Sequence, residues 1–201
     1  HSLTHVPASA DVPVRKCRAQ FARVIDNKDD HVGPQRHALN AEIAVVGAGP
    51  AGLLAAREAA QRGIEVVVLE EHAQIGVPSH CAGLLSTSGL AALQLAPPAD
   101  VVQNHVVGAR IYSPSGHNIT VYRGTREALV IDRSLFDQWL AMLAEERGAK
   151  IRTRKHVIGT AIDLNRRIVR VRNDDNVSAF VVIDGEGARS TILKGAGLTP
   201  V

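Results

Sequence analysis

The fold of this chain is decided by residues 42–70, which read EIAVVGAGPAGLLAAREAAQRGIEVVVLE. Two short runs rich in β-branched residues, 42–46 and 64–69, are typical of strands that are buried on both faces. Between them, residues 53–62 are strong helix formers, and Gly63 is a typical helix stop. The order strand, helix, strand predicts a βαβ unit of a parallel sheet.

The turn between the first strand and the helix carries a G-x-G-x-x-G pattern. Its first glycine permits a tight turn, its second lets the backbone approach a pyrophosphate, and its third lets the helix pack close to the strand. Free N–H groups and the helix dipole would hold the anion. The predicted pyrophosphate-binding residues are Gly47, Gly49, Pro50, Ala51 and Gly52.

Glu70 ends the second predicted strand, where a carboxylate can accept hydrogen bonds from a ribose diol. The same carboxylate would repel the 2′-phosphate of NADP. The loop and Glu70 together therefore predict a binding site for FAD or NAD.

Composition narrows the class of protein further. The 201 residues are 45% hydrophobic and 21% charged, which is ordinary for a globular domain and excludes collagen-like, coiled-coil and mostly disordered chains. A net charge of +3 and an aromatic content of 3% argue against a nucleic-acid partner. Two cysteines make no disulfide framework and favour a reducing compartment. Without a long apolar run or a signal-peptide pattern, we expect a cytoplasmic protein, and peripheral contact with a membrane stays open.

Residues 1–40 differ from the rest because they mix His, Pro, Asp and Arg without periodicity. They predict a poorly ordered N-terminal extension. Four histidines in this segment match no zinc-ligand spacing, so no metal site is expected; they are His1, His5, His31 and His37.

Further elements are predicted downstream. Apolar spacing indicates helices over 88–95 and 133–147, and a turn at 113–116 indicates a hairpin within 106–123. Short apolar runs indicate four strands near the C-terminus, over 150–153, 157–164, 167–172 and 179–183.

From about residue 41 to its C-terminus, the chain resembles the FAD-dependent geranylgeranyl reductases, which have the p-hydroxybenzoate-hydroxylase-type fold. The resemblance rests on a Gly-x-Pro-x-x-Cys motif from Gly76 to Cys81 and on Arg-x-x-Phe-Asp from Arg133 to Asp137. It implies an α/β fold: a Rossmann-like FAD-binding βαβ sheet with a β-meander and part of a second, β-rich substrate domain. The FAD-binding domain would comprise 41–100 and 131–201, and 101–130 would be an inserted hairpin of the substrate domain.

The resemblance also implies roles for single residues. Cys81, with Ala82 and Gly83, would lie beside the isoalloxazine ring, where the thiol would tune the flavin or touch the substrate alkene. Arg133 would supply a cation near the flavin-side half of FAD. A positive charge at a helix start opposes the helix dipole, so a nearby anion would justify it.

Two further residues follow from the same resemblance. Val157 would meet the adenine through its backbone. Glu186 stands where the family has the Asp of an Asp-Gly pair, and its longer side chain shifts the carboxylate.

The implied activity is reduction of isoprenoid C=C bonds in lipids by hydride transfer from reduced FAD. The substrate would be a geranylgeranyl or other polyprenyl lipid, and the electron donor NAD(P)H or a ferredoxin. Members of this family continue beyond this length and carry there a second flavin motif and most of the substrate cavity, so the resemblance implies that the C-terminal part of the fold would be missing from these 201 residues. Two alternatives stay open: an FAD-dependent aromatic hydroxylase or halogenase on the same fold, and an inactive FAD-binding fragment of a longer protein.

Overall fold

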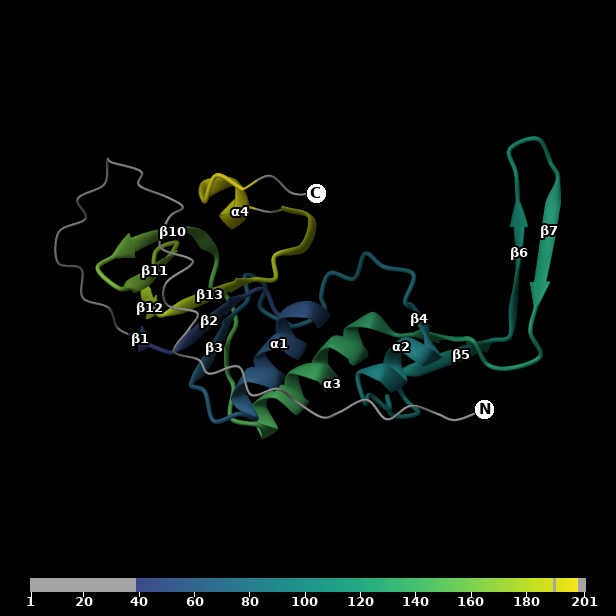
Figure 1. Cartoon of the computed structure of the whole chain (residues 1–201), viewed down its shortest axis with the longest axis horizontal. Helices are drawn as coiled ribbons and strands as arrows, with labels where there is room; N and C mark the ends of the chain where they lie inside the picture. The colour runs from purple at the N-terminus through teal and green to yellow at the C-terminus, as the bar shows by residue number, and fades with distance from the viewer. Residues whose placement is uncertain (1–38, 190, 199–201) are drawn as a thin grey trace, which may run out of the picture. The chain divides into compact units, whose positions relative to one another are not determined.

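Figure 1 shows a computed structural model of the chain, which describes residues 39–189 and 191–198. All of them belong to one compact unit, residues 35–201. The expectations for residues 1–38, including poor order, the four histidines and Cys17, lie outside the described residues. Strand β1, Leu39–Asn40, shows that regular structure is present before residue 41.

A parallel sheet lies at the centre, with the strand order β13-β2-β3-β9. Its strands are β2 (Ile43–Val46), β3 (Val66–Leu69), β9 (Lys150–Arg152) and β13 (Val181–Asp184). Helices α1 (Pro50–Ala60) and α3 (Arg133–Glu146) share one core cluster with Val45, Val66 and Val68. The predicted βαβ unit and the helix after residue 132 are confirmed.

The other face of the sheet is covered by a second sheet, with the strand order β1-β12-β11-β10. Its longer strands form an antiparallel meander: β10 (Val157–Asp163), β11 (Arg166–Val171) and β12 (Val177–Ala179). Val67 and Leu69 pack here, whereas Val66 and Val68 face the helices. The predicted burial of these strands on both faces is confirmed, because alternate side chains enter opposite cores.

The prediction of one strand over 179–183 is wrong. β12 ends at Ala179 and β13 begins at Val181, and the two strands belong to different sheets. The chain changes sheets there because the N–H groups of Phe180 and Val181 both donate to the carbonyl of Glu42, at 3.0 and 3.2 Å.

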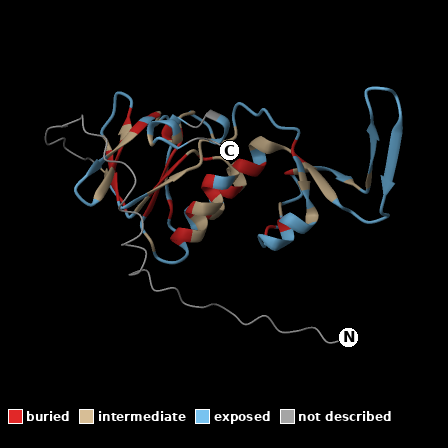
Figure 2. Ribbon diagram, turned by 45° about the horizontal axis from the view of Figure 1, so that its top comes forward, coloured by how far each residue is buried: buried red, intermediate tan, exposed pale blue. Residues whose placement is uncertain are grey.

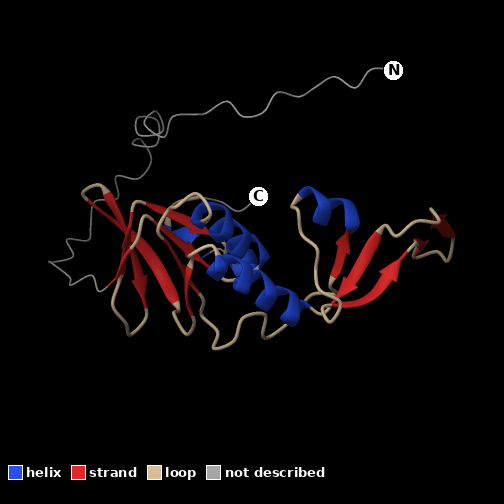
Figure 3. Cartoon of the chain, turned by 90° about the horizontal axis from the view of Figure 1, so that it is seen from below, coloured by secondary structure: helices blue, strands red, loops and turns tan. Residues whose placement is uncertain are grey.

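Two smaller sheets follow β3 in the chain (Figure 3). One is antiparallel and holds β4 (Leu84–Ser86), β8 (Ala128–Ile131) and β5 (Val102–Val106). The other is the predicted hairpin, β6 (Gly108–Tyr112) with β7 (Asn118–Tyr122). The remaining elements are α2 (Thr87–Ala92), the 3-10 turn η2 (Gly187–Arg189) and α4 (Thr191–Gly195). Within the described residues, no helix has the length and apolar character needed to cross a membrane.

Candidate cofactor site

The glycine loop leads from the carboxyl end of β2 into α1, and at two of its glycines the backbone is packed too tightly for a side chain. Gly47 has a φ of +94°, and a Cβ there would lie 2.4 Å from the carbonyl oxygen of Gly185. A Cβ on Gly52 would lie 2.1 Å from the carbonyl oxygen of Gly47 and 3.2 Å from Val45 Cγ1. The predicted tight turn and close approach of helix to strand are therefore both present.

Gly49 is different because a Cβ built on it meets nothing within 4 Å. It is the N-cap of α1, makes no side-chain capping bond, and is followed by Pro50 at the first helical position. The first N–H groups of the 11-residue helix α1 are thus not capped by a side chain. The open space at Gly49 and the positive end of the helix dipole fit an anion such as a pyrophosphate.

Glu70 lies directly after β3 and is 8% exposed. Its Oε2 accepts a hydrogen bond from the N–H of Ala48 at 2.8 Å, which ties the glycine loop to the end of the neighbouring strand. Its Oε1 accepts from the N–H of His72 at 2.9 Å and lies 2.6 Å from His72 Nδ1. The predicted ribose acid and the predicted pyrophosphate loop therefore meet at the carboxyl edge of the sheet, where such folds bind ligands.

Sequence reasoning missed the side chains that surround Glu70. His72 Nε2 is 3.7 Å from Glu71 Oε1, and Glu71 Oε2 is 2.8 Å from His156 Nδ1. The Lys155 N–H donates to the Glu70 carbonyl at 2.7 Å, which brings the start of β10 close to Glu70. We call the region formed by the glycine loop, residues 70–72 and residues 155–156 the glycine-loop corner. The sequence feature that could have revealed this cluster is the pair of acids at 70–71 followed by a histidine. These residues come directly after a strand of a parallel sheet, so their side chains lie together at its carboxyl edge.

The predicted adenine residue, Val157, is the first residue of β10 and follows His156 directly. Its side chain is buried in the core between the two larger sheets. Its side chain therefore faces the core and not a ligand, and a contact of its backbone with the adenine stays a prediction.

The Gly-x-Pro-x-x-Cys segment packs against the start of α3. Gly76 has a φ of +77°, and a Cβ on it would lie 2.8 Å from Ser134 Cα. The hydroxyl of Ser134 donates to the Gly76 carbonyl at 3.0 Å, and Gln138 Nε2 donates to the Ile75 carbonyl at 3.2 Å. The two motifs that carried the family resemblance are therefore in direct contact.

Arg133 opens α3 and forms a two-point ion pair with Asp137 one turn later. Its Nε and Nη2 donate to the two carboxylate oxygens at 3.1 and 3.0 Å. Asp137 is 4% exposed, and burial raises its pKa although Arg133 opposes the rise and the charge of Glu70 adds to it. The carboxylate of Asp137 is therefore the nearby anion that balances the positive charge of Arg133 at the helix start. No ligand phosphate is needed to explain this charge, and the position of Arg133 near the flavin stays a prediction.

Cys81 is exposed, as is Ala82, whereas Gly83 is buried and a Cβ on it would lie 2.2 Å from the Ile131 carbonyl oxygen. The Gly83 N–H, and to a smaller degree Arg133, lower the pKa of the Cys81 thiol. The structure thus brings Cys81, Arg133 and Asp137 together.

Glu186 has a structural partner of its own. Its Oε2 accepts from the N–H of Ile192 in α4 at 2.8 Å, and its N–H donates to Asp184 Oδ1 at 2.9 Å. One carboxylate oxygen therefore holds the start of α4, and a contact of Glu186 with the cofactor stays a prediction.

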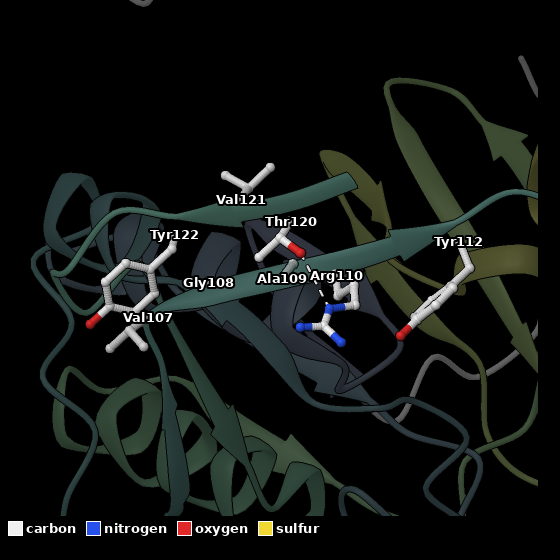
Figure 4. A pocket seen from close by; sticks show the side chains of 8 residues that line it. All are labelled: Val107, Gly108, Ala109, Arg110, Tyr112, Thr120, Val121 and Tyr122. Atoms are coloured by element: carbon white, nitrogen blue, oxygen red, sulfur yellow. Dashed lines mark hydrogen bonds between the residues drawn. The ribbon is translucent and has the colours of Figure 1, made fainter. Parts of the chain in front are cut away.

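A shallow depression on the hairpin, shown in Figure 4, is a separate feature. Arg110 Nε donates to Thr120 Oγ1 at 3.2 Å across it. Its lining residues are Val107, Gly108, Ala109, Arg110, Tyr112, Thr120, Val121 and Tyr122. It contains none of the residues predicted to bind a cofactor, so it is not the candidate site.

Comparison with known proteins agrees with this geometry. A family model described as an FAD binding domain matches residues 40–201. The chain is 36% identical over 163 residues to digeranylgeranylglycerophospholipid reductase 2 of Methanopyrus kandleri, covering 79% of this chain and 40% of the relative. It is 33% identical over 171 residues to the digeranylgeranylglycerophospholipid reductase of Methanothrix thermoacetophila, covering 80% and 42%. The chain thus spans about 40% of the length of these relatives.

Solved structures give the same result. A geranylgeranyl bacteriochlorophyll reductase-like protein from Thermoplasma acidophilum superposes with a TM-score of 0.74 at 31% identity, covering 80% of this chain and 43% of that protein. A myxobacterial chondrochloren halogenase superposes with a TM-score of 0.63 at 22% identity, covering 78% and 39%. The second likeness shows a shared fold alone.

Proposed function

Because this chain belongs to the FAD-binding domain family, we propose that it is the cofactor-binding portion of an FAD-dependent reductase that saturates C=C bonds of isoprenoid lipids. The observation that carries the proposal is the contact between the Gly76–Cys81 segment and the start of α3. This contact holds the start of the cysteine-bearing segment against α3, which supports a position of the segment near the cofactor. The relatives named as reductases of digeranylgeranyl lipids support the substrate class.

The residues present fit FAD. The uncapped N–H groups of α1, with the open space at Gly49, would hold the pyrophosphate. Glu70 would accept a hydrogen bond from the adenosine ribose, and the backbone at Val157 would face the adenine. The Cys81 loop, with Arg133, would then border the flavin half.

When bound and reduced, FAD would supply hydride for one alkene carbon, and a proton would be needed at the other. The chain's own residues bind and orient the cofactor. Asp137 holds the guanidinium of Arg133 near the Cys81 thiol, which fixes the position of this donor group at the edge of the site. We propose that the β4-β8-β5 sheet and the hairpin contribute part of the substrate side, and that the electrons come from NAD(P)H or a ferredoxin.

The first test is cofactor binding by the 201-residue chain. We expect the purified protein to take up FAD and to show a bound-flavin spectrum after reconstitution. Gly49→Val should abolish binding while the protein stays folded, because its side chain would enter space that is open in the protein and needed by the pyrophosphate. Unchanged binding in Gly49→Val would contradict the assignment of the loop.

The second test addresses the reaction. Chemically reduced FAD, the chain and a geranylgeranyl lipid are incubated without oxygen, and the lipid is examined by mass spectrometry for added hydrogen. Because the chain spans about 40% of its relatives, we expect less saturation than with a full-length relative under the same conditions. Oxygen uptake coupled to substrate-dependent NADPH oxidation would instead favour an aromatic hydroxylase.

A further inference from the structure

The carboxylate of Glu70 is almost fully engaged by the protein itself. A carboxylate offers about four acceptor positions. Oε1 fills two of them with the backbone N–H and the ring Nδ1 of His72, at 2.9 and 2.6 Å. Oε2 fills one with the N–H of Ala48 at 2.8 Å. One acceptor position therefore remains, and it lies on the oxygen that already contacts the glycine loop.

The ring of His72 is placed by its surroundings. A carboxylate oxygen only accepts hydrogen bonds, so the tautomer of His72 that suits the 2.6 Å contact carries its proton on Nδ1. On the far side of the ring, Nε2 is 3.7 Å from Glu71 Oε1, and Glu71 is itself held by His156 through a 2.8 Å contact. The imidazole thus lies between two carboxylates, one of which leads back to the start of β10.

We propose that His72 is a positioning residue for the cofactor: by filling Oε1 of Glu70, it leaves Oε2 to accept from a hydroxyl of the adenosine ribose. This inference rests on the proposed FAD-binding function, and it adds to it a residue that helps Glu70 to recognise the ribose. The side chain of His72 is 42% exposed, so its replacement leaves no cavity in a core. Its effect should therefore appear in ligand recognition more than in folding.

A positioning role and a merely structural role predict different ligand profiles. If His72 only supported the corner, its loss would weaken FAD and its analogues by the same factor. If it directs Glu70 at the ribose, its loss selectively removes the preference for FAD over an analogue that lacks a ribose hydroxyl. The informative quantity is the ratio of the two dissociation constants, not either constant alone.

The experiment titrates the full 201-residue chain with FAD and with FAD analogues built on 2′-deoxyadenosine and 3′-deoxyadenosine. A hydrogen bond to a charged group sets the expected preference of the wild type for FAD at roughly tenfold against one of the two analogues. His72→Leu should reduce that ratio to within about threefold, and Glu70→Gln should reduce it as well. His72→Asn should restore much of it, since its side-chain amide can donate from nearly the same position as Nδ1.

His156→Leu is the matched comparison, because His156 also pairs with a carboxylate, that of Glu71 and not that of Glu70. Since it acts on the His72 ring only through the 3.7 Å contact with Glu71, it should change the ratio much less than His72→Leu does. A wild-type ratio in His72→Leu, or an equal loss in His156→Leu, would overturn the inference. Binding of FAD by the wild type without any preference over the analogues would overturn it and leave the proposed function intact. Failure of the wild type to bind FAD would remove the function and the inference together.

Discussion

The central sheet and the β6–β7 hairpin are both rich in apolar residues, yet they are covered very differently (Figure 2). Every residue of β3 is buried, because helices pack on one face of its sheet and the meander packs on the other. Nearly every residue of the hairpin is exposed, including Ile111 and Ile119, which face each other across the two strands. Apolar sequence thus contributes to stability only where the chain provides something to cover it.

The largest effect is expected where the backbone of the covered region has no room. In Gly52→Ala the new Cβ would lie 2.1 Å from a backbone oxygen that cannot move without opening the turn. We expect a loss of more than about 3 kcal/mol in the free energy of unfolding, measured by urea denaturation. Gly49→Ala, in the same loop, should change stability little because its Cβ meets nothing. Equal losses in the two variants would contradict the described loop.

A second prediction concerns the ion pair inside the covered region. Arg133→Met removes the partner of Asp137 and leaves a buried carboxylate uncompensated, which should cost about 3–5 kcal/mol at neutral pH. Asp137→Asn should cost less, because the Arg133 side chain is 21% exposed and can reach water.

The pH dependence of the Arg133→Met variant has a definite sign. Burial raises the pKa of Asp137 in the folded protein, and removing Arg133 removes the opposing influence. A raised pKa means that the folded state binds more protons, so stability falls as pH rises through that pKa and returns on acidification. Thermal melts should therefore show the deficit of Arg133→Met shrinking as the pH is lowered from neutrality. A deficit that grows on acidification would contradict this account.

The covered region was also the part most readable from the sequence. Local patterns correctly indicated its strands and helices: β-branched apolar runs at 42–46 and 64–69, strong helix formers at 53–62, and helical apolar spacing at 133–147. The hairpin was found from its turn signal at 113–116. The β4-β8-β5 sheet was not found, since β4 and β5 are mostly exposed and lack the buried apolar runs of β2 and β3, and its strands gain partners only through distant pairing.

The contacts within the candidate site also divide into those that follow from local sequence and those that depend on distant pairing. The glycine loop and Glu70 could be recognised because their spacing follows from one βαβ unit. The pairing of Arg133 with Asp137 was readable in principle, as the two are four residues apart on a helix. The pair formed by Glu71 and His156 was not, since 85 residues separate its members and only the folded sheets bring them together.

In the chain, the Cys81 loop lies between β3 of the central sheet and the β6–β7 hairpin, and it combines features of both. Cys81 is exposed like the hairpin, but its chemistry is set by neighbours in the packed part. The Gly83 N–H and Arg133 lower the pKa of its thiol, and the charge of Asp137 opposes them. In a Cys17→Ser background, the pH midpoint for reaction with iodoacetamide should therefore lie below that of a free cysteine. Arg133→Gln should raise this midpoint and Asp137→Asn should lower it further, and shifts of the same sign would contradict the arrangement.

The smallest effect is expected from a valine-to-threonine exchange on the hairpin, and the same exchange in the sheet provides its control. Valine and threonine have nearly the same shape, so the exchange tests mainly whether a hydroxyl is buried. Val68 is 0% exposed, and Val68→Thr should cost about 1–3 kcal/mol because the hydroxyl has no water to bind. Val121 is 42% exposed, and Val121→Thr should stay within about 0.5 kcal/mol of the wild type. Urea denaturation at several protein concentrations measures both. A cost for Val121→Thr that approaches that of Val68→Thr would show that the hairpin is covered in solution, and its dependence on concentration would tell whether a second copy or residues 1–38 provide the cover.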